Sequence, residues 1–335
     1  MTVRIAVLGV GRIGRMHAEL IARQVPGASL AMVQDVDANA AAAIGAELGV
    51  AHTTDAAEVF ASELVDAVAI CSSTDTHVPL LIAAARGGKA IFCEKPVSLD
   101  LRKVDEALAV VKASGVPIQI GFNRRFDPAH RSVRDAVSSG AVGEVHIVRI
   151  TSRDPAPPPI AYVKVSGGLF LDMMVHDFDM ARYVTGSEVV EVYAKAAVRV
   201  DPAIGEAGDV DTAVVTLLHE NGCITTIDNS RQAVYGYDQR VEAFGSGGMA
   251  ASENPPSHSG MRRTAAGTIT PTIAYFFLDR YIPSYIAEWK AFVDYVTDGG
   301  SSPVDADAGR APLVIGLAAK LSVQEGRPVL CAEIV

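Results

Sequence analysis

A chain of 335 residues, 49% of them hydrophobic and 20% charged, is long enough for two folded domains and excludes a disordered or fibrous protein. The net charge of −10 argues against a nucleic-acid partner, because an acidic surface repels phosphates. No run of about 18 residues lacks a polar or charged interruption, which predicts no membrane span. The N-terminus also lacks the pattern of a signal peptide, so we expect a cytoplasmic protein.

The cysteines are too scattered for a disulfide framework or a zinc site. They are Cys71, Cys93, Cys223 and Cys331, and no two of them form a Cys-x-x-Cys pair. We therefore expect reduced, mostly buried thiols and no metal cofactor. A small uncharged substrate fits the acidic composition best.

In the first 120 residues, short apolar runs alternate with Ala/Leu-rich segments of helical length. The predicted strands are Val3 to Leu8, Leu30 to Val33, Val65 to Ile70, Ala90 to Cys93 and Pro117 to Ile120. The predicted helices are Arg12 to Gln24, Ala38 to Leu48, His77 to Arg86 and Leu101 to Ala113. This alternation predicts an α/β domain over residues 1–121, a Rossmann-type, doubly wound parallel sheet. Ligands of such sheets bind beyond the carboxyl ends of the strands.

After Gly121 strands dominate, which predicts an α+β domain over residues 122–335 with an open, mainly antiparallel sheet. The predicted strands are Glu144 to Thr151, Val189 to Val200, Val210 to Leu218, Cys223 to Asn229 and Arg240 to Phe244. The predicted helices are Pro128 to Ser138, Leu169 to Val184, Pro283 to Thr297 and Gly309 to Glu325, and the last two could instead pack on the first domain. The predicted loops are Pro155 to Pro159, Glu253 to Arg263 and Gly299 to Pro303.

One strand also bears on assembly. Residues 212–218, TAVVTLL, are apolar at both odd and even positions, whereas a half-exposed strand alternates. We therefore expect helices on one face of the second sheet and a second subunit on the other, in an oligomer.

A glycine-rich turn follows the first predicted strand. It reads Gly-x-Gly-x-x-Gly and comprises Gly9, Gly11, Arg12, Ile13 and Gly14. Asp35 ends the second strand, 21 residues after Gly14. Glycines let the backbone approach a pyrophosphate, and a carboxylate here accepts from a ribose hydroxyl, which predicts a dinucleotide site. Asp35 would repel a 2′-phosphate, so NAD is favoured over NADP, although Arg12 could reach either phosphate. Asp37 is interpreted as a helix-start residue.

Two further strand exits add polar groups to this predicted site. The third strand is followed by Ser72, Thr74 and His77, which are either cofactor contacts or an ordinary helix start. The fourth strand runs into Glu94, Lys95 and Pro96. A lysine at this exit either faces the nicotinamide end of a dinucleotide laid across the sheet or is a solvated surface residue.

A second cluster follows a glycine pair in the second domain. Asp172 and His176 are four residues apart and share one helix face, with Asp179 three residues further along. This could be a structural Asp–His pair or part of a catalytic set. A metal site is less favoured, because the sequence shows no third and fourth ligand.

These motifs together resemble the Gfo/Idh/MocA family of dinucleotide-dependent oxidoreductases over essentially the whole chain. The landmarks are the glycine turn with Asp35, then Glu94-Lys95-Pro96, then GGLFLDMMVHDFD over residues 167–179. Residues 121–127 and 229–240 look like the inositol-oxidising branch of that family.

The resemblance implies a catalytic set of Lys95, Asp172 and His176. His176 would act as general base on a ring hydroxyl as hydride leaves for NAD. Asp172 would orient the imidazole, and Lys95 would stabilise the reacting oxygen. Further substrate contacts implied by position in the family pattern are Asn123, Arg124, Asp154, Asp179 and Tyr235.

The expected activity is therefore NAD-dependent oxidation of a cyclic polyol, myo- or scyllo-inositol first. A hexopyranose such as D- or L-glucose is a second possible substrate for the same machinery. A non-catalytic dinucleotide sensor and a sugar–sugar oxidoreductase with tightly held NADP are the remaining alternatives. The resemblance favours a homotetramer over a dimer.

Overall fold

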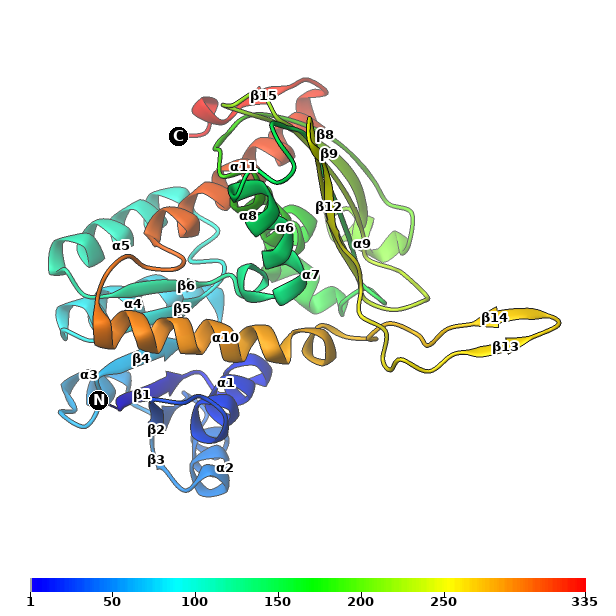
Figure 1. Ribbon diagram of the computed structural model, residues 1–335. Helices are drawn as coiled ribbons and strands as arrows, with labels where there is room; N and C mark the ends of the chain where they lie inside the picture. Colours follow the sequence, from blue (N-terminus) through cyan, green and yellow to red (C-terminus); the bar gives the residue numbers. More distant parts are fainter. Residues whose placement is uncertain (1) are drawn as a thin grey trace. The chain divides into compact units, whose positions relative to one another are not determined.

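The computed structural model describes residues 2–335, which form two compact units (Figure 1). The first unit runs to Asn123 and also includes Tyr285–Ala311. The second comprises Arg124–Ser284 and Pro312–Val335. Within the described residues, no helix combines the length and hydropathy needed to cross a bilayer.

The first unit is built on a parallel sheet, as the alternating pattern predicts. The sheet has the order β3-β2-β1-β4-β5-β6. Its strands are β1 (Val3–Leu8), β2 (Ala28–Gln34), β3 (Ala51–Thr53), β4 (Ala67–Ile70), β5 (Ala90–Glu94) and β6 (Ile118–Gly121). The helices are α1 (Arg12–Arg23), α2 (Ala38–Leu48), α3 (Ala56–Ala61), α4 (Thr74–Arg86) and α5 (Leu101–Ser114). The prediction missed only β3 and α3, because both are short and β3 has no apolar run.

A segment far along the chain completes the core of the first unit. Helix α10 (Phe277–Asp298) contributes Trp289, which is fully buried and stacks on Phe92 of β5 with ring centroids 4.4 Å apart. The buried Gln119 side chain donates to the carbonyl of Glu288 at 3.2 Å. The first unit is therefore discontinuous in sequence, with residues from α10 packed on its parallel sheet.

The second unit contains a mixed, mainly antiparallel sheet of order β12-β11-β7-β10-β9-β8-β15. Its strands are β7 (Val145–Arg153), β8 (Val189–Ala197), β9 (Thr212–His219), β10 (Ile224–Ser230), β11 (Asp238–Gly245), β12 (Gly248–Ser252) and β15 (Val329–Leu330). The helices are α6 (Pro128–Ser138), α7 (Ile160–Ser166), α8 (Val175–Thr185), α9 (Pro202–Glu206) and α11 (Ala306–Glu325), the last beginning in the first unit. Only β7 and β10 pair in parallel.

Helices α6 and α8 pack against one face of this sheet (Figure 1). Residues on the opposite face, such as Val214 and Phe244, are exposed to solvent in the described part of the chain. Along β9, buried and exposed residues alternate, so the apolar residues at both odd and even positions do reach both faces. Cross-strand register aligns five of the outward residues in a row: Leu218, Ile224, Ile147, Phe244 and Met249. We call this set the apolar row.

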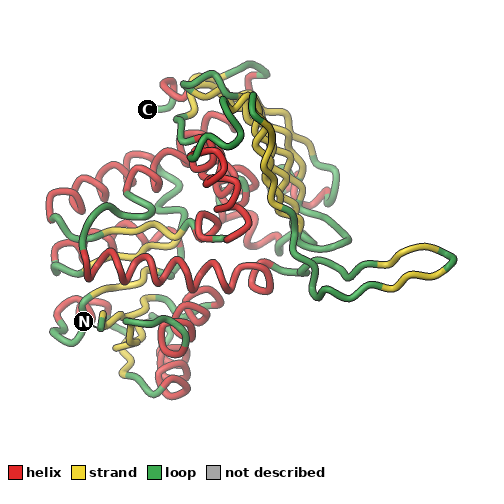
Figure 2. Tube along the Cα trace, in the orientation of Figure 1, coloured by secondary structure: helices red, strands yellow, loops and turns green. Residues whose placement is uncertain are grey.

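The interpretation of residues 253–263 as a plain surface loop is wrong in part. Strand β13 (Arg262–Thr264) pairs with β14 (Gly267–Ile269) to form a projecting hairpin (Figure 2). The sequence hides it because its pairing uses backbone groups and its side chains show no apolar alternation.

Candidate active site

The glycine turn between β1 and α1 has the backbone that a phosphate site needs. Gly9 has φ of +85°, and a Cβ there would meet the backbone of Ser72 at 2.5 Å. A Cβ on Gly14 would overlap the carbonyl of Gly9. Gly11 is the N-cap of α1, and no side chain caps this helix start, which is the arrangement found at phosphate-binding helix N-termini. Arg12 and Ile13 occupy the first turn of α1.

Asp35 is fixed beside this turn by two backbone donors. Its Oδ2 accepts from Val10 N at 2.8 Å and its Oδ1 from Asp37 N at 2.9 Å. The Asp37 side chain accepts from the N–H groups of Asn39 and Ala40, which confirms its assignment as the helix-start residue of α2. The Asp35 carboxylate therefore lies at the end of β2, next to the turn.

At the exit of β4, His77 joins two neighbouring loops. The buried ring contacts the carbonyl of Ser72 through Nε2 at 3.0 Å and that of Pro96 through Nδ1 at 2.9 Å. Burial lowers the pKa of His77. The Ser72 and Thr76 hydroxyls share a hydrogen bond of 2.6 Å, and Thr74 begins α4. His77 thus ties the exit of β4 to the exit of β5.

The turn that carries Lys95 is anchored by a chain of three side chains. Trp289 Nε1 donates to His17 Nδ1 at 2.8 Å. Because an indole only donates, the proton of a neutral His17 ring is on Nε2, which lies 2.8 Å from Glu94 Oε1. The other Glu94 oxygen accepts from the backbone N of Lys95 at 3.2 Å. Lys95 is half-buried, at the carboxyl end of the sheet.

In the second unit, a glycine pair introduces a short π-helical turn. Gly167 and Gly168 have φ of +92° and +79°, the left-handed region that glycine adopts without strain. The carboxylate of Asp209 accepts from Leu169 N, with N–O distances of 3.0 and 3.1 Å. Met174 N donates to Leu169 O at 2.8 Å, which closes the π turn Leu169–Met173 just before α8.

This turn and α8 present the predicted Asp–His pair. Asp172 and His176 are both half-buried, while Met173, Met174 and Val175 between them are buried. The Tyr162 hydroxyl donates to Asp172 Oδ1 at 2.9 Å. Asp172 and His176 therefore remain on an accessible side of an otherwise buried segment.

Arg231 is a residue of this site that the sequence interpretation did not single out. It is 3% exposed and lies between two carboxylates, with Nη2 3.5 Å from Asp172 Oδ2 and Nη1 3.6 Å from Asp154 Oδ2. Because Ser230 of β10 pairs in parallel with Arg153 of β7, Arg231 and Asp154 follow at the same level. Burial raises the pKa of Asp154 to about 6, against the lowering effect of Arg231 and Arg124.

Two of the expected substrate contacts are engaged inside the unit. Arg124 Nη1 donates to the buried Asp177 at 2.6 Å. Asp179 is 1% exposed and accepts two hydrogen bonds from Arg125, at 2.8 and 2.5 Å. Both side chains therefore have structural partners. Asp179 does not share the accessible side of Asp172 and His176.

Asn123 is buried in a different way. It is 3% exposed, and its side-chain nitrogen makes no hydrogen bond to the described part of the chain. A buried donor without an acceptor costs free energy, so this nitrogen is available to a ligand.

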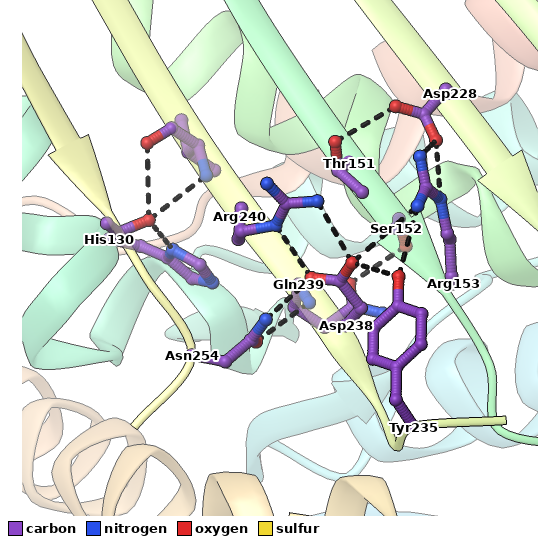
Figure 3. Close-up of polar contacts among 12 residues, drawn as sticks. His130, Thr151, Ser152, Arg153, Asp228, Tyr235, Asp238, Gln239, Arg240 and Asn254 are labelled. Carbon is purple, nitrogen blue, oxygen red and sulfur yellow. Dashed lines mark hydrogen bonds and ion pairs between the residues drawn. The ribbon is translucent and has the colours of Figure 1, made fainter. Parts of the chain in front are cut away.

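Tyr235 lies at the end of the second sheet in a polar network (Figure 3). Its hydroxyl donates to Asp238 at 2.7 Å and accepts from Arg153 at 3.0 Å. Asp238 also accepts from Arg240 at 2.8 Å and from Asn254 at 2.6 Å. Tyr235 is 51% exposed, so one side of its ring is open to a ligand.

Among residues 2–335, no group of three or more His, Cys, Asp or Glu side chains could hold a metal ion. Of the free cysteines, Cys71, Cys93 and Cys223 are buried and Cys331 is half-buried.

Two family models match the chain. Residues 3–122 match the oxidoreductase family, NAD-binding Rossmann fold, and residues 130–251 match the GFO/IDH/MocA C-terminal domain.

Several relatives match the chain almost end to end. It is 46% identical over 333 residues to the myo-inositol 2-dehydrogenase of Thermotoga maritima, covering 99% of both chains. The crystal structure of a probable dehydrogenase from Thermotoga maritima superposes with a TM-score of 0.98 at 46% identity, covering 99% of this chain and 100% of that one. The crystal structure of scyllo-inositol dehydrogenase from Lactobacillus casei, with bound NAD(H) and scyllo-inositol, superposes with a TM-score of 0.92 at 29% identity. The match covers 99% of this chain and 100% of that one.

Proposed function

Because the chain belongs to the Gfo/Idh/MocA oxidoreductase family, we propose that it is an NAD-dependent dehydrogenase that oxidises a ring hydroxyl of myo- or scyllo-inositol to the ketone. The observation that carries the proposal is the 46% identity, over 99% of both chains, to a myo-inositol 2-dehydrogenase. We assign the chemistry to Lys95, Asp172 and His176.

The first unit fits NAD. The glycine turn leaves a cradle that a Cβ at Gly9 or Gly14 would fill, and Asp35 offers a fixed carboxylate for a ribose hydroxyl. We assign cofactor binding to Gly9, Gly11, Arg12, Ile13, Gly14, Asp35, Ser72, Thr74, His77, Glu94 and Lys95. His77 and Glu94 would contribute by holding the two strand exits, since their polar atoms are occupied by the protein.

NAD, when bound, supplies the hydride acceptor. His176 takes the proton of the reacting hydroxyl as the carbon loses hydride. Asp172 orients the imidazole and stabilises its cationic form, and Lys95 donates a hydrogen bond to the oxygen as the ketone forms. Arg231 and Tyr162 hold the Asp172 carboxylate, which fixes its direction before substrate binds.

The polyol hydroxyls need several fixed donors and acceptors. Besides Lys95, Asp172 and His176, we assign direct contacts to Asp154, Asn123 and Tyr235, which are accessible or carry an unused donor. Arg124 and Asp179 would support the same site from the interior through Asp177 and Arg125.

A hexopyranose is the second candidate substrate, because its ring of mostly equatorial hydroxyls resembles scyllo-inositol in outline. The same three catalytic residues would act on it unchanged. A sensor without catalysis would need neither a proton acceptor nor its carboxylate partner, so the ordered Asp172 and its two partners favour an enzyme.

We further propose a homotetramer, with the apolar row as one contact between copies. Leu218, Ile224, Phe244 and Met249 are 37–54% exposed on the open face of the sheet, and a second copy would remove them from water. The free cysteines fit a reducing compartment, which supports a cytoplasmic location.

The test is NADH formation, followed by absorbance, with NAD or NADP and a substrate panel. The panel contains myo-, scyllo- and chiro-inositol, D- and L-glucose, galactose and xylose. We expect turnover of an inositol with NAD. Turnover of a hexose alone would replace the inositol assignment, and NAD binding without any turnover would contradict the enzymatic one.

A further inference from the structure

A hairpin in the second unit stands apart from every sheet and helix core. Residues 255–270, here called the arm, are all exposed to solvent. Strands β13 and β14 pair with each other, with Arg262 opposite Ile269 and Thr264 opposite Gly267. Figures 1 and 2 show the arm projecting from the second unit. The backbone pairing of the two strands is therefore made within the arm, and the side chains of the arm are exposed to solvent.

Such a hairpin is poorly stabilised alone. Two strands of three residues without a hydrophobic face are marginal in water. Met261 and Ile269 are 55% and 56% exposed, and directly paired residues share a face, so Arg262 lies with Ile269. A partner that buried these apolar groups would stabilise the arm.

Charge indicates the nature of that partner. The arm contains Arg262 and Arg263 and no Asp or Glu, whereas the whole chain has a net charge of −10. A cationic arm on an anionic protein is attracted to an acidic surface. A second copy of this chain, with 39 Asp and Glu against 29 Lys and Arg, is an acidic partner of this kind.

The root of the arm is firmly held and continues from the sheet edge. Ser257 N donates to Thr272 O at 2.9 Å, and Tyr237 N donates to Ala274 O at 2.9 Å. The arm follows β12, the edge strand that carries Met249 of the apolar row. The arm thus extends from the edge of the face to which we assign contact between copies.

We infer that the arm docks on an acidic surface of a second copy of this chain and holds the assembly together. The inference rests on the assembly proposed above, and it names a second contact that the apolar row does not supply. Arg262 and Arg263 provide the charge, and Met261 and Ile269 provide the buried apolar area.

Two full-length variants test it by light-scattering mass measurement. In the first, residues 259–270 are replaced by Asn-Gly, which keeps the Ser257–Thr272 pairing at the root. In the second, Arg262→Glu and Arg263→Glu reverse the charge of an intact arm, with Arg262→Lys and Arg263→Lys as the charge-preserving control.

We expect the shortened variant to have half the wild-type mass. We expect the charge-reversed variant to dissociate at a protein concentration roughly tenfold higher than the wild type does. The lysine control keeps the wild-type assembly.

A photo-crosslinking residue at Ala265, in the turn of the arm, gives a direct test. We expect a covalent dimer whose crosslinked peptide lies in an acidic region of the other copy. Unchanged mass in both variants, a monomeric wild type, or no covalent dimer would overturn the inference. The wild-type protein is also tested for binding to duplex DNA and to anionic phospholipid vesicles. If it binds one of them, and charge reversal abolishes that binding without changing the mass of the assembly, the arm has another partner and the inference is wrong. NAD-linked inositol oxidation is measured separately, so failure of the proposed activity leaves these mass measurements intact.

Discussion

Aspartates of the candidate site differ in their partners rather than in their sequence surroundings. Asp172 is half-buried and contacts Tyr162 and Arg231, so its carboxylate is fixed but accessible. Asp177 and Asp179, five and seven residues later, are buried and paired with arginines. Asp179 accepts two hydrogen bonds from Arg125, and Asp177 accepts one from Arg124 and one from Asn229, so both carboxylates are directed into the interior of the second unit.

Replacing His176 tests the general base. For His176→Ala we expect kcat to fall roughly 10²–10⁴-fold, because the variant loses the assigned general base. NAD affinity, measured by calorimetry, stays near the wild-type value. His146→Ala, which removes an exposed histidine of β7, is the control and keeps full turnover. Loss of NAD binding in the His176 variant would mean a structural role.

Replacing Arg231 tests its action on the two carboxylates. Arg231 lowers the pKa of Asp154, so Arg231→Gln raises that pKa further above about 6. If catalysis needs the ionised carboxylate, the acidic limb of the kcat/KM profile moves to higher pH. Arg231→Lys keeps the positive charge and should return the acidic limb to its wild-type pH. Arg149→Gln is the control at an exposed ion pair with Glu242 on the same sheet, and it should leave the pH of the limb unchanged. If the acidic limb of the kcat/KM profile of Arg231→Gln stays at the wild-type pH, the proposed role of Arg231 in the site is wrong.

Replacing Asp35 tests cofactor choice. Asp35→Asn keeps acceptor capacity for Val10 N and removes the negative charge. We expect the ratio of kcat/KM for NAD to that for NADP to fall, because the repulsion of a 2′-phosphate is lost. Asp37→Asn, at the helix cap, is the matched control. An unchanged ratio would contradict the ribose assignment.

At the scale of elements, strand ends and helix starts place the polar groups. The exits of β1, β2, β4 and β5 gather the glycine turn, Asp35, His77 and Glu94 at one edge of the parallel sheet. In the second unit, the one parallel pair, β7 with β10, brings Asp154 beside Arg231. The π turn before α8 depends on Asp209, which lies 40 residues away in sequence.

Removing the Asp209 carboxylate tests this dependence. Asp209→Ala leaves Leu169 N without its acceptor, which costs about 1 kcal/mol of folding stability by analogy with helix caps. We expect kcat to fall as well, because Asp172 lies on the turn that Asp209 anchors. Asp201→Ala removes the cap of α9 and should cost similar stability in urea unfolding with kcat unchanged. Equal kcat in both variants would show that the turn holds without Asp209.

At the scale of the whole molecule, the chain forms two units, each with its own core. The first unit holds the glycine turn, Asp35, Lys95 and Asn123, and the second holds Asp172, His176 and Arg231. The second unit also has an open sheet face with an apolar row, an arrangement that a chain acting alone would leave in water.

A charge in the apolar row tests the proposed contact between copies. For Leu218→Asp we expect half the wild-type mass, because an unpaired carboxylate would be buried against the second copy. Leu218 is 37% exposed within one chain, so unfolding of the separated chain should change little. Leu64→Asp, at a 69% exposed position of the first unit, is the control. A wild-type mass for Leu218→Asp would exclude this face as an interface.

The sequence by itself determined the local features. Apolar periodicity predicted the strands and helices of the parallel sheet, and glycines with Asp35 at fixed spacing predicted the dinucleotide cradle, because these depend on neighbouring residues. Tertiary structure alone decided which polar residues stay accessible. The pairing of β7 with β10 places Arg231 beside Asp154, and ion pairs with distant arginines bury Asp177 and Asp179. The hairpin of the arm could likewise not be predicted from the sequence, because two exposed strands that pair through their backbones show no hydrophobic pattern.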